Sequence, residues 1–157
     1  MIQTGLYSPE ERARRDATVW TLVQGVLAPL QFLAFVISTG LVVRYLATGE
    51  GYALATVSVL IKTGFLYTIM VTGAIWEKAV FDQYLFAPAF FWEDVVSILV
   101  IALHSAYVWV LWTAALAPTE QMWLALAAYA AYVINAAQFL HKLRLARRQA
   151  GYKAITV

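Results

Sequence analysis

The sequence contains no cysteine, only two histidines and few charged residues. The absence of cysteine excludes disulfide bonds, thiolate metal sites and cysteine nucleophiles. Charged residues make up 13% of the 157 residues and hydrophobic residues 62%, whereas soluble domains are about a quarter charged and about half apolar. The net charge of +2 is too small to indicate a nucleic-acid partner. A lipid bilayer is therefore the solvent that this composition fits.

Four long apolar runs predict membrane-spanning helices. The first run is too long for a signal-peptide core and has no clear cleavage site, so we expect it to stay in the mature protein. Short connections predict one all-α integral membrane domain over residues 1–157, an antiparallel bundle of four transmembrane helices. We expect the helices at residues 18–46, 52–76, 94–116 and 121–143, between a polar N-terminal head at 1–16 and a basic tail at 144–157.

The distribution of charge predicts how this multi-pass protein lies in the membrane. Basic residues gather before the first predicted helix and after the fourth, whereas the turns at Glu50 and Glu120 contain no lysine or arginine. The positive-inside rule then puts both termini in the cytoplasm, as an even number of spans requires. In the head, the run Ser8-Pro9-Glu10-Glu11 is typical of a helix start.

The connection between the second and third helices is rich in acids and aromatic residues. Residues 76–94 read WEKAVFDQYLFAPAFFWED and hold four of the nine carboxylates, Glu77, Asp82, Glu93 and Asp94. This stretch is too apolar for a solvated loop, so we predict an interfacial aromatic segment bent at Pro88. It indicates proton chemistry on a large flat ligand. The alternatives are an aromatic belt at the lipid headgroups and acids that merely cap a helix N-terminus.

Polar residues from all four predicted helices fall at a similar depth. At a rise of about 1.5 Å per residue, they lie within about two turns of the cytoplasmic surface. Polar groups in a bilayer tend to face the bundle interior. Because these residues share one depth, we predict that they form a single site. Interhelical hydrogen bonding is the alternative for the uncharged members. The set comprises Gln24, Glu77, Glu93, Asp94, Ser97, Asn135 and Gln138, with Gln31 on the same face of the first helix as Gln24.

Two ionisable residues, Lys62 and His104, are expected near the middle of the membrane. A buried lysine is neutral, reaches for the interface or binds an anionic group. A buried histidine is either a hydrogen-bonded core residue or a ligand for the metal of a tetrapyrrole. The other histidine, His141, lies about half a membrane away. A bis-histidine haem is therefore disfavoured.

Five stretches together resemble one known family. They are ERARRDATVWTLVQGVLAP (Glu11–Pro29), YTIMVTGAIWEK (Tyr67–Lys78), YLFAPAFFWEDV (Tyr84–Val95), ALHSAY (Ala102–Tyr107) and AAYVINAAQFL (Ala130–Leu140). The sequence resembles the 3-vinyl bacteriochlorophyllide hydratase family over about residues 7–148. Asp82 and His141 depart from the family pattern, because uncharged residues are expected there, and we rank both below the other polar residues.

The resemblance implies a hydro-lyase of bacteriochlorophyll synthesis in the cytoplasmic membrane, inner or intracytoplasmic, of a photosynthetic bacterium. Such an enzyme adds water to the C3 vinyl group of chlorophyllide a, or of a related vinyl chlorin, and gives the 3-(1-hydroxyethyl) product. It needs no cofactor and no metal of its own, because the magnesium belongs to the chlorin. A homo-oligomer or an association with other pigment-synthesis enzymes stays open.

The carboxylates suit this reaction. Addition of water in the Markovnikov sense needs a proton on the terminal vinyl carbon, after which water attacks the cation that the macrocycle delocalises. Glu93 with Asp94, and Glu77 on the facing helix, are the candidate catalytic residues. One acid would protonate the vinyl group, and an ionised partner would stabilise the cation and accept a proton from water. Burial beside a second carboxylate favours a protonated acid.

The other candidates would bind the substrate. The aromatic candidates, expected to stack on the ring, are Trp76, Phe90, Phe91 and Trp92, and His104 could ligate the substrate magnesium. The polar candidates are Asn135, Gln138, Gln24, Gln31 and Lys62, with the propionate near Lys78 or Lys142. Two alternatives stay open: a non-catalytic tetrapyrrole carrier or pigment-protein assembly factor, which would not need the acids, and a purely structural membrane subunit.

Overall fold

The computed structural model describes residues 5–155, and within this range it consists of five helices without a strand. Four of them are long and apolar enough to cross a membrane. The helices are α1 (Pro9–Ala17), α2 (Val19–Thr48), α3 (Tyr52–Phe81), α4 (Phe91–Thr113) and α5 (Pro118–Ile155). They confirm the predicted all-α membrane bundle.

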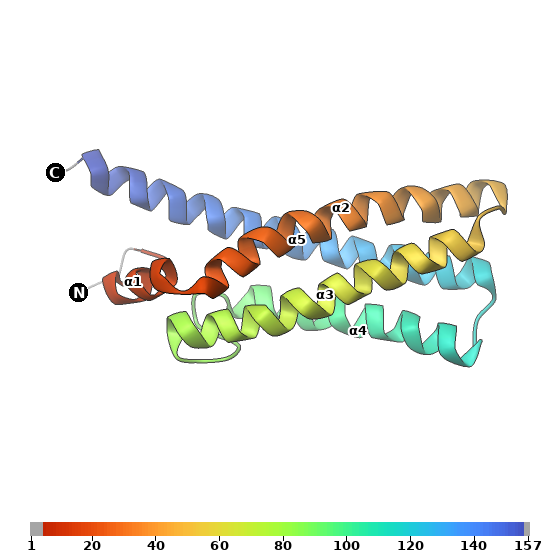
Figure 1. The fold of residues 1–157 in the computed structure, drawn as a ribbon, viewed down its shortest axis with the longest axis horizontal. Coiled ribbons are helices and arrows are strands. Elements are labelled where there is room, and N and C mark those ends of the chain that lie inside the picture. Colours follow the sequence, from red (N-terminus) through yellow and green to blue (C-terminus); the bar gives the residue numbers. More distant parts are fainter. Residues whose placement is uncertain (1–4, 156–157) are drawn as a thin grey trace.

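The four long helices form two antiparallel hairpins that lie against each other (Figure 1). Helix α2 packs along α3, and α4 packs along α5, while α2 also touches α5 and α3 touches α4. Both ends of the chain lie at one end of the bundle, which we call the terminal end. The turns α2–α3 and α4–α5 lie at the opposite turn end. The segment between α3 and α4 therefore shares the terminal end with both termini.

Several helix ends differ from the predicted ones. Helix α3 runs five residues beyond the predicted end at residue 76, and α4 begins at Phe91 rather than at 94. A contact with α1 stabilises the end of α3: Arg14 Nε donates a hydrogen bond of 2.7 Å to the carbonyl of Val80. Helix α5 continues through most of the basic tail, whose arginines and lysines favour helix. The connection between α3 and α4 is therefore shorter than expected.

Helix α1 starts as the sequence predicts. Ser8 Oγ accepts a hydrogen bond from the backbone N–H of Glu11 at 3.1 Å, and the Glu11 carboxylate accepts one from the Ser8 N–H at 2.7 Å. This reciprocal pair is a capping box, and Pro9 occupies the first helical position. The helix packs against α3 at the terminal end.

The connecting segment 82–90 turns back on the bundle through strained backbone. Asp82 has φ 60° and Phe86 has φ 61°, so the chain bends at these residues as well as near the predicted Pro88. The left-handed region costs roughly 1–2 kcal/mol for a residue with a side chain. Such conformations persist when surrounding contacts hold them. A buried carboxyl group provides this contact at Phe86, whereas Asp82 is held by Lys78.

Candidate active site

Glu77 and Asp94 meet beneath the connecting segment. Glu77 lies near the end of α3 and Asp94 in the first turn of α4, and each is 5% exposed. Glu77 Oε2 accepts a hydrogen bond from the Ala87 N–H at 3.3 Å, and Asp94 Oδ2 accepts one from the Phe86 N–H at 2.7 Å. Because the Phe86 and Ala87 N–H groups are consecutive along the chain, the two carboxyl groups lie beside each other. Two buried carboxyl groups side by side resist being ionised together, so one shared proton is the arrangement that burial favours. We call these two residues the carboxyl pair.

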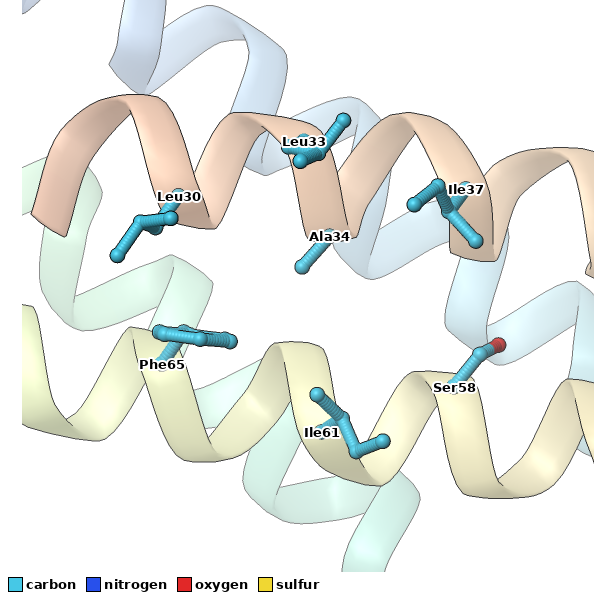
Figure 2. Close-up of a pocket in the computed structure, with 7 residues that line it drawn as sticks. All are labelled: Leu30, Leu33, Ala34, Ile37, Ser58, Ile61 and Phe65. Carbon is cyan, nitrogen blue, oxygen red and sulfur yellow. The ribbon is translucent and has the colours of Figure 1, made fainter.

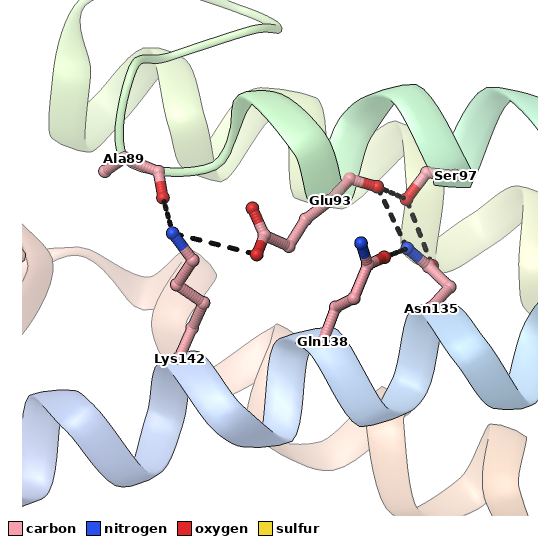
Figure 3. A network of polar contacts seen from close by, with 6 residues as sticks. All are labelled: Ala89, Glu93, Ser97, Asn135, Gln138 and Lys142. Atoms are coloured by element: carbon pink, nitrogen blue, oxygen red, sulfur yellow. Dashed lines mark hydrogen bonds and ion pairs between the residues drawn. The ribbon is translucent and has the colours of Figure 1, made fainter.

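Glu93 has different surroundings, although it precedes Asp94 in the chain. Its Oε1 atom lies 3.7 Å from Lys142 Nζ, which also donates a hydrogen bond of 2.6 Å to the Ala89 carbonyl (Figure 3). Glu93 is 6% exposed, and its Oε2 atom is buried without a hydrogen-bond partner in the described part of the chain. The three predicted acids thus divide into a proton-sharing pair and one carboxylate in an ion pair.

A small polar network joins α4 to α5 next to Glu93. The backbone carbonyl of Glu93 lies 2.8 Å from Ser97 Oγ and 2.9 Å from Asn135 Nδ2. Ser97 Oγ lies 3.1 Å from Asn135 Oδ1, and Gln138 Oε1 accepts from Asn135 Nδ2 at 3.4 Å. The predicted Asn135 and Gln138 therefore do lie beside a catalytic candidate, where they fix the first turn of α4 relative to α5.

The predicted aromatic residues separate into an inner and an outer group. Phe90 is buried, and its ring packs edge-on against Trp76 at 5.6 Å between ring centres. Trp76 Nε1 donates to Thr21 Oγ1 at 2.9 Å. In contrast, Phe91 is 42% exposed and Trp92 is 68% exposed on the outside of the bundle. Only the outer rings have faces open to a large ligand or to lipid.

Tyr7 completes the inner aromatic cluster, a role that sequence reasoning missed. Its ring stacks on Phe81 at 5.8 Å and lies 6.4 Å from the Phe90 ring, with the Arg15 guanidinium 4.8 Å away on the Tyr7 ring. The neighbouring N–H of Leu6 donates to Gln149 Oε1 at 2.9 Å. The segment before α1 thereby connects the ends of α3 and α5. No local pattern in the sequence marks this contact.

Lys62 and His104 pair with each other, well away from the acids. Both are fully buried, and Lys62 Nζ lies 3.0 Å from His104 Nε2. His104 Nδ1 lies 2.8 Å from the Val100 carbonyl. A carbonyl only accepts, so Nδ1 carries the ring proton and Nε2 accepts from Lys62. Eleven residues separate Glu93 from His104 on α4, or about 16 Å. Both ring nitrogens are thus engaged within the protein.

The remaining candidates lie outside the acid site. Gln24 Nε2 donates to Thr72 Oγ1 at 2.6 Å between α2 and α3, and Gln31 is buried farther along α2. Asp82 is exposed, and the hydrogen bond from the Lys78 ammonium, 2.6 Å from Asp82 Oδ1, lowers the pKa of this carboxyl group. His141 is exposed on α5. Asp82 and His141, which the sequence analysis ranked lower, are thus both exposed and lie outside the acid site.

A groove of about 280 Å³ runs between α2 and α3 in the apolar part of the bundle (Figure 2). It contains none of the predicted site residues and no ionisable side chain, so it supplies no acid for the expected reaction. Its lining consists of Leu30, Leu33, Ala34, Ile37, Ser58, Ile61 and Phe65.

Comparison with known proteins identifies the chain. A family model described as 2-vinyl bacteriochlorophyllide hydratase matches residues 7–145. The chain belongs to this family. It is 74% identical over 142 residues to the 2-vinyl bacteriochlorophyllide hydratase of Cereibacter sphaeroides, with 90% of this chain and 88% of the relative covered. It is 72% identical over 146 residues to the protein of the same name from Rhodobacter capsulatus, with 93% and 85% covered. No solved structure matches the chain.

The family assignment confirms the resemblance noted from the sequence, and the acids, Asn135, Gln138 and Lys142 lie inside the matched range. The sequence did contain a signal for the contact of Lys142 with Glu93. Asn135, Gln138 and Lys142 are spaced by three and four residues, so they share one face of α5. The sequence analysis predicts Lys142 only as a neighbour of the substrate propionate, and the structure adds its contact with Glu93.

Proposed function

We propose that this protein adds water to the C3 vinyl group of chlorophyllide a, or of a related vinyl chlorin, and releases the 3-(1-hydroxyethyl) product for bacteriochlorophyll synthesis. The vinyl position called 2 in the family's name corresponds to C3 in current chlorin numbering. Membership of a hydratase family over most of the chain supports the reaction. The observation that carries the mechanism is the buried carboxyl pair, Glu77 and Asp94, held by two consecutive N–H groups of the connecting segment.

The carboxyl pair is the proposed proton donor. The π electrons of the vinyl group form a bond to the shared proton at the terminal carbon, and a cation develops on the carbon next to the macrocycle. The carboxylate left behind keeps its hydrogen bonds from the N–H groups of Phe86 and Ala87. These fixed donors stabilise the negative charge as it forms, without any reorganisation. A proton from solvent then reloads the pair.

Glu93 is the proposed carboxylate that stabilises the cation and accepts a proton from the attacking water. It is suited to this role because Lys142 forms an ion pair with its Oε1 atom, while its Oε2 atom has no hydrogen-bond partner in the described part of the chain. The water oxygen bonds to the cationic carbon and loses one proton to Glu93. The sum of the two steps is the addition of one water molecule, so the reaction needs neither an oxidant nor a reductant.

The substrate is proposed to lie against the connecting segment, with its ring on exposed aromatic faces such as those of Phe91 and Trp92. Lys78 is the proposed neighbour for the propionate, because its side chain is 42% exposed against 24% for Lys142, and the propionate would there replace the exposed Asp82 as its partner. An axial contact from His104 to the substrate magnesium would require Lys62 to move away from Nε2. Both termini are proposed to face the cytoplasm of the bacterial membrane, so that the chlorin arrives from the inner leaflet.

The test of this function is direct. Membranes that contain the protein are incubated with chlorophyllide a, and the pigments are extracted and separated. We expect a product heavier by one water molecule, with the shorter-wavelength absorption that follows the loss of vinyl conjugation. Asp94→Asn and Glu77→Gln serve as matched variants that keep the side-chain volume. Pigment that binds without any turnover by the wild type would contradict the hydratase and favour the carrier.

A further inference from the structure

We propose that the attacking water binds at Glu93 Oε2, beside the amide of Gln138, and that Lys142 is a positioning residue for this water site. The inference rests on the proposed function and extends it, because it specifies which carboxylate oxygen holds the nucleophile and which residue prepares it. It concerns the space between α4 and α5 shown in Figure 3.

The first observation is the unpartnered carboxylate oxygen. Glu93 is 6% exposed, and Oε2 is buried without a hydrogen-bond partner among residues 5–155. An ionised carboxylate offers about four lone-pair positions, and buried polar atoms are nearly always hydrogen-bonded. Leaving such an acceptor unpaired destabilises the folded protein. The oxygen is therefore placed to accept a hydrogen bond from a small ligand, and water is the reactant that the hydration requires.

The second observation concerns Lys142, which occupies the other oxygen of the same carboxylate. Its Nζ atom lies 3.7 Å from Glu93 Oε1 and donates a hydrogen bond of 2.6 Å to the Ala89 carbonyl. Lys142 thus balances the charge of Glu93, leaves Oε2 available and holds the end of the connecting segment against α5. It reaches the reacting atoms only through Glu93.

The third observation is the orientation of Gln138. Its Oε1 atom accepts from Asn135 Nδ2 at 3.4 Å, so its NH2 group turns away from Asn135. Figure 3 shows this amide in the same space between α4 and α5 as the Glu93 carboxylate. Gln138 lies between Asn135 and Lys142 on one face of α5, and both of these neighbours contact Glu93. Its amide is therefore the group proposed to orient a water bound at the carboxylate.

The site is distinct from the carboxyl pair, although Glu93 and Asp94 are consecutive. Adjacent residues on a helix point about 100° apart, and the two carboxylates have different polar partners: Asp94 accepts from the Phe86 N–H, whereas Glu93 pairs with Lys142. One acid can therefore deliver a proton while the other acts on water. The two steps should be separable by mutation.

Deuterium labelling separates them. The reaction is run in D2O, and the deuterium content of the product and of the recovered substrate is measured. In Glu93→Gln we expect hydration to fall about 100-fold, while the carboxyl pair still protonates the vinyl group. Because the cation then reverts by losing a proton, deuterium should accumulate on the terminal vinyl carbon of unreacted substrate. Asp94→Asn should lose both hydration and this exchange.

Lys142 is tested with three variants on α5. Lys142→Met should lower kcat about 10-fold with little change in KM and with the same vinyl deuteration as Glu93→Gln, because a misplaced base slows only water attack. Lys142→Arg keeps the positive charge and should restore most of kcat. If Lys142 acted only through the packing of its methylene chain, this dependence on charge would not be expected. Arg144→Met, at an exposed position two residues away, is the control for loss of one positive charge.

Three results would overturn the inference. The first is wild-type hydration in both Glu93→Gln and Lys142→Met. The second is a loss of hydration in Glu93→Gln without deuterium in the vinyl group, which would make Glu93 part of the proton donor. The third is a Lys142→Arg variant as slow as Lys142→Met. Full hydration by Glu77→Gln and Asp94→Asn would instead refute the proposed proton donor and leave the role of Glu93 to be judged on its own result.

Discussion

The two ends of this bundle are built on opposite principles. At the turn end, close packing of Val42, Val59, Tyr107 and Met122 joins the helices. Neutral hydroxyl groups are buried there: Ser38 Oγ lies 2.6 Å from Tyr129 Oη, and Tyr107 Oη has no hydrogen-bond partner in the described part of the chain. At the terminal end, charged groups are buried, and strained backbone is held down by carboxyl groups. A well-packed scaffold at one end thus supports a site at the other end whose buried charges and strained backbone lower stability, as is common for functional sites.

The largest expected effect is on chemistry at the terminal end. Asp94→Asn and Glu77→Gln each remove an acid from the carboxyl pair but keep the side-chain shape, so hydration should fall about 1,000-fold, within the range for a lost general acid. Initial rates with chlorophyllide a measure the effect. The conservative change Glu50→Gln, in the exposed α2–α3 turn, should hydrate at the wild-type rate. A loss in Glu50→Gln as well would remove the contrast between the two ends.

The next largest effect is on stability at the turn end. Met122 is fully buried between helices, and Met122→Ala should lower the free energy of unfolding by about 2–5 kcal/mol because it leaves a cavity. Thermal unfolding in mild detergent measures this loss. The rate of hydration per folded molecule should stay at the wild-type value. A selective loss of turnover in the folded fraction would mean that the turn end takes part in catalysis.

A smaller effect of opposite sign is expected at the end of α4. Ala114 has φ 51°, a conformation that glycine adopts without strain, so Ala114→Gly should raise the free energy of unfolding by about 1 kcal/mol. Chemical denaturation of the detergent-solubilised protein checks this value. An unchanged or lower stability would show that neighbouring contacts already relieve the strain at this turn.

The smallest effect is expected for the fourth acid of the connecting segment. Asp82 is exposed and paired with Lys78, so Asp82→Asn should leave hydration at the wild-type rate. Lys78 lowers the pKa of Asp82. The stability from this pair is therefore present above the ordinary carboxyl pKa and disappears as the pH falls through the lowered one. A strong loss of hydration in this variant would reverse the ranking of the acids.

The sequence was sufficient for the architecture. Hydropathy predicted four long helices, and the acids and aromatic residues of 76–94 marked the connection between the second and third of them. The spacing of Asn135 and Gln138 correctly indicated polar groups on α5 near Glu93. These features depend on local composition and helical period, which can be read directly from the chain.

Local composition and helical period did not show which of the acids pair with each other and which stands alone. Glu77 meets Asp94 only because the segment 82–90 folds back, and that path depends on left-handed backbone at Asp82 and Phe86, where no glycine signals it. The packing of Tyr7 on Phe81 likewise joins residues that are far apart in the chain. Lys62 and His104 were both expected at the same depth in the membrane. Their pairing also requires that α3 and α4 turn these two side chains toward each other, which the sequence does not show.

The most direct test of the central claim is a double-mutant cycle on the carboxyl pair. Single-turnover hydration of chlorophyllide a is measured for the wild type, Glu77→Gln, Asp94→Asn and the double variant. If the two groups hold one catalytic proton together, the double variant should be no more than a few-fold slower than either single variant, because residues that act as a unit are strongly non-additive. Rate losses that simply multiply, or single variants that hydrate at the wild-type rate, would contradict the shared-proton mechanism.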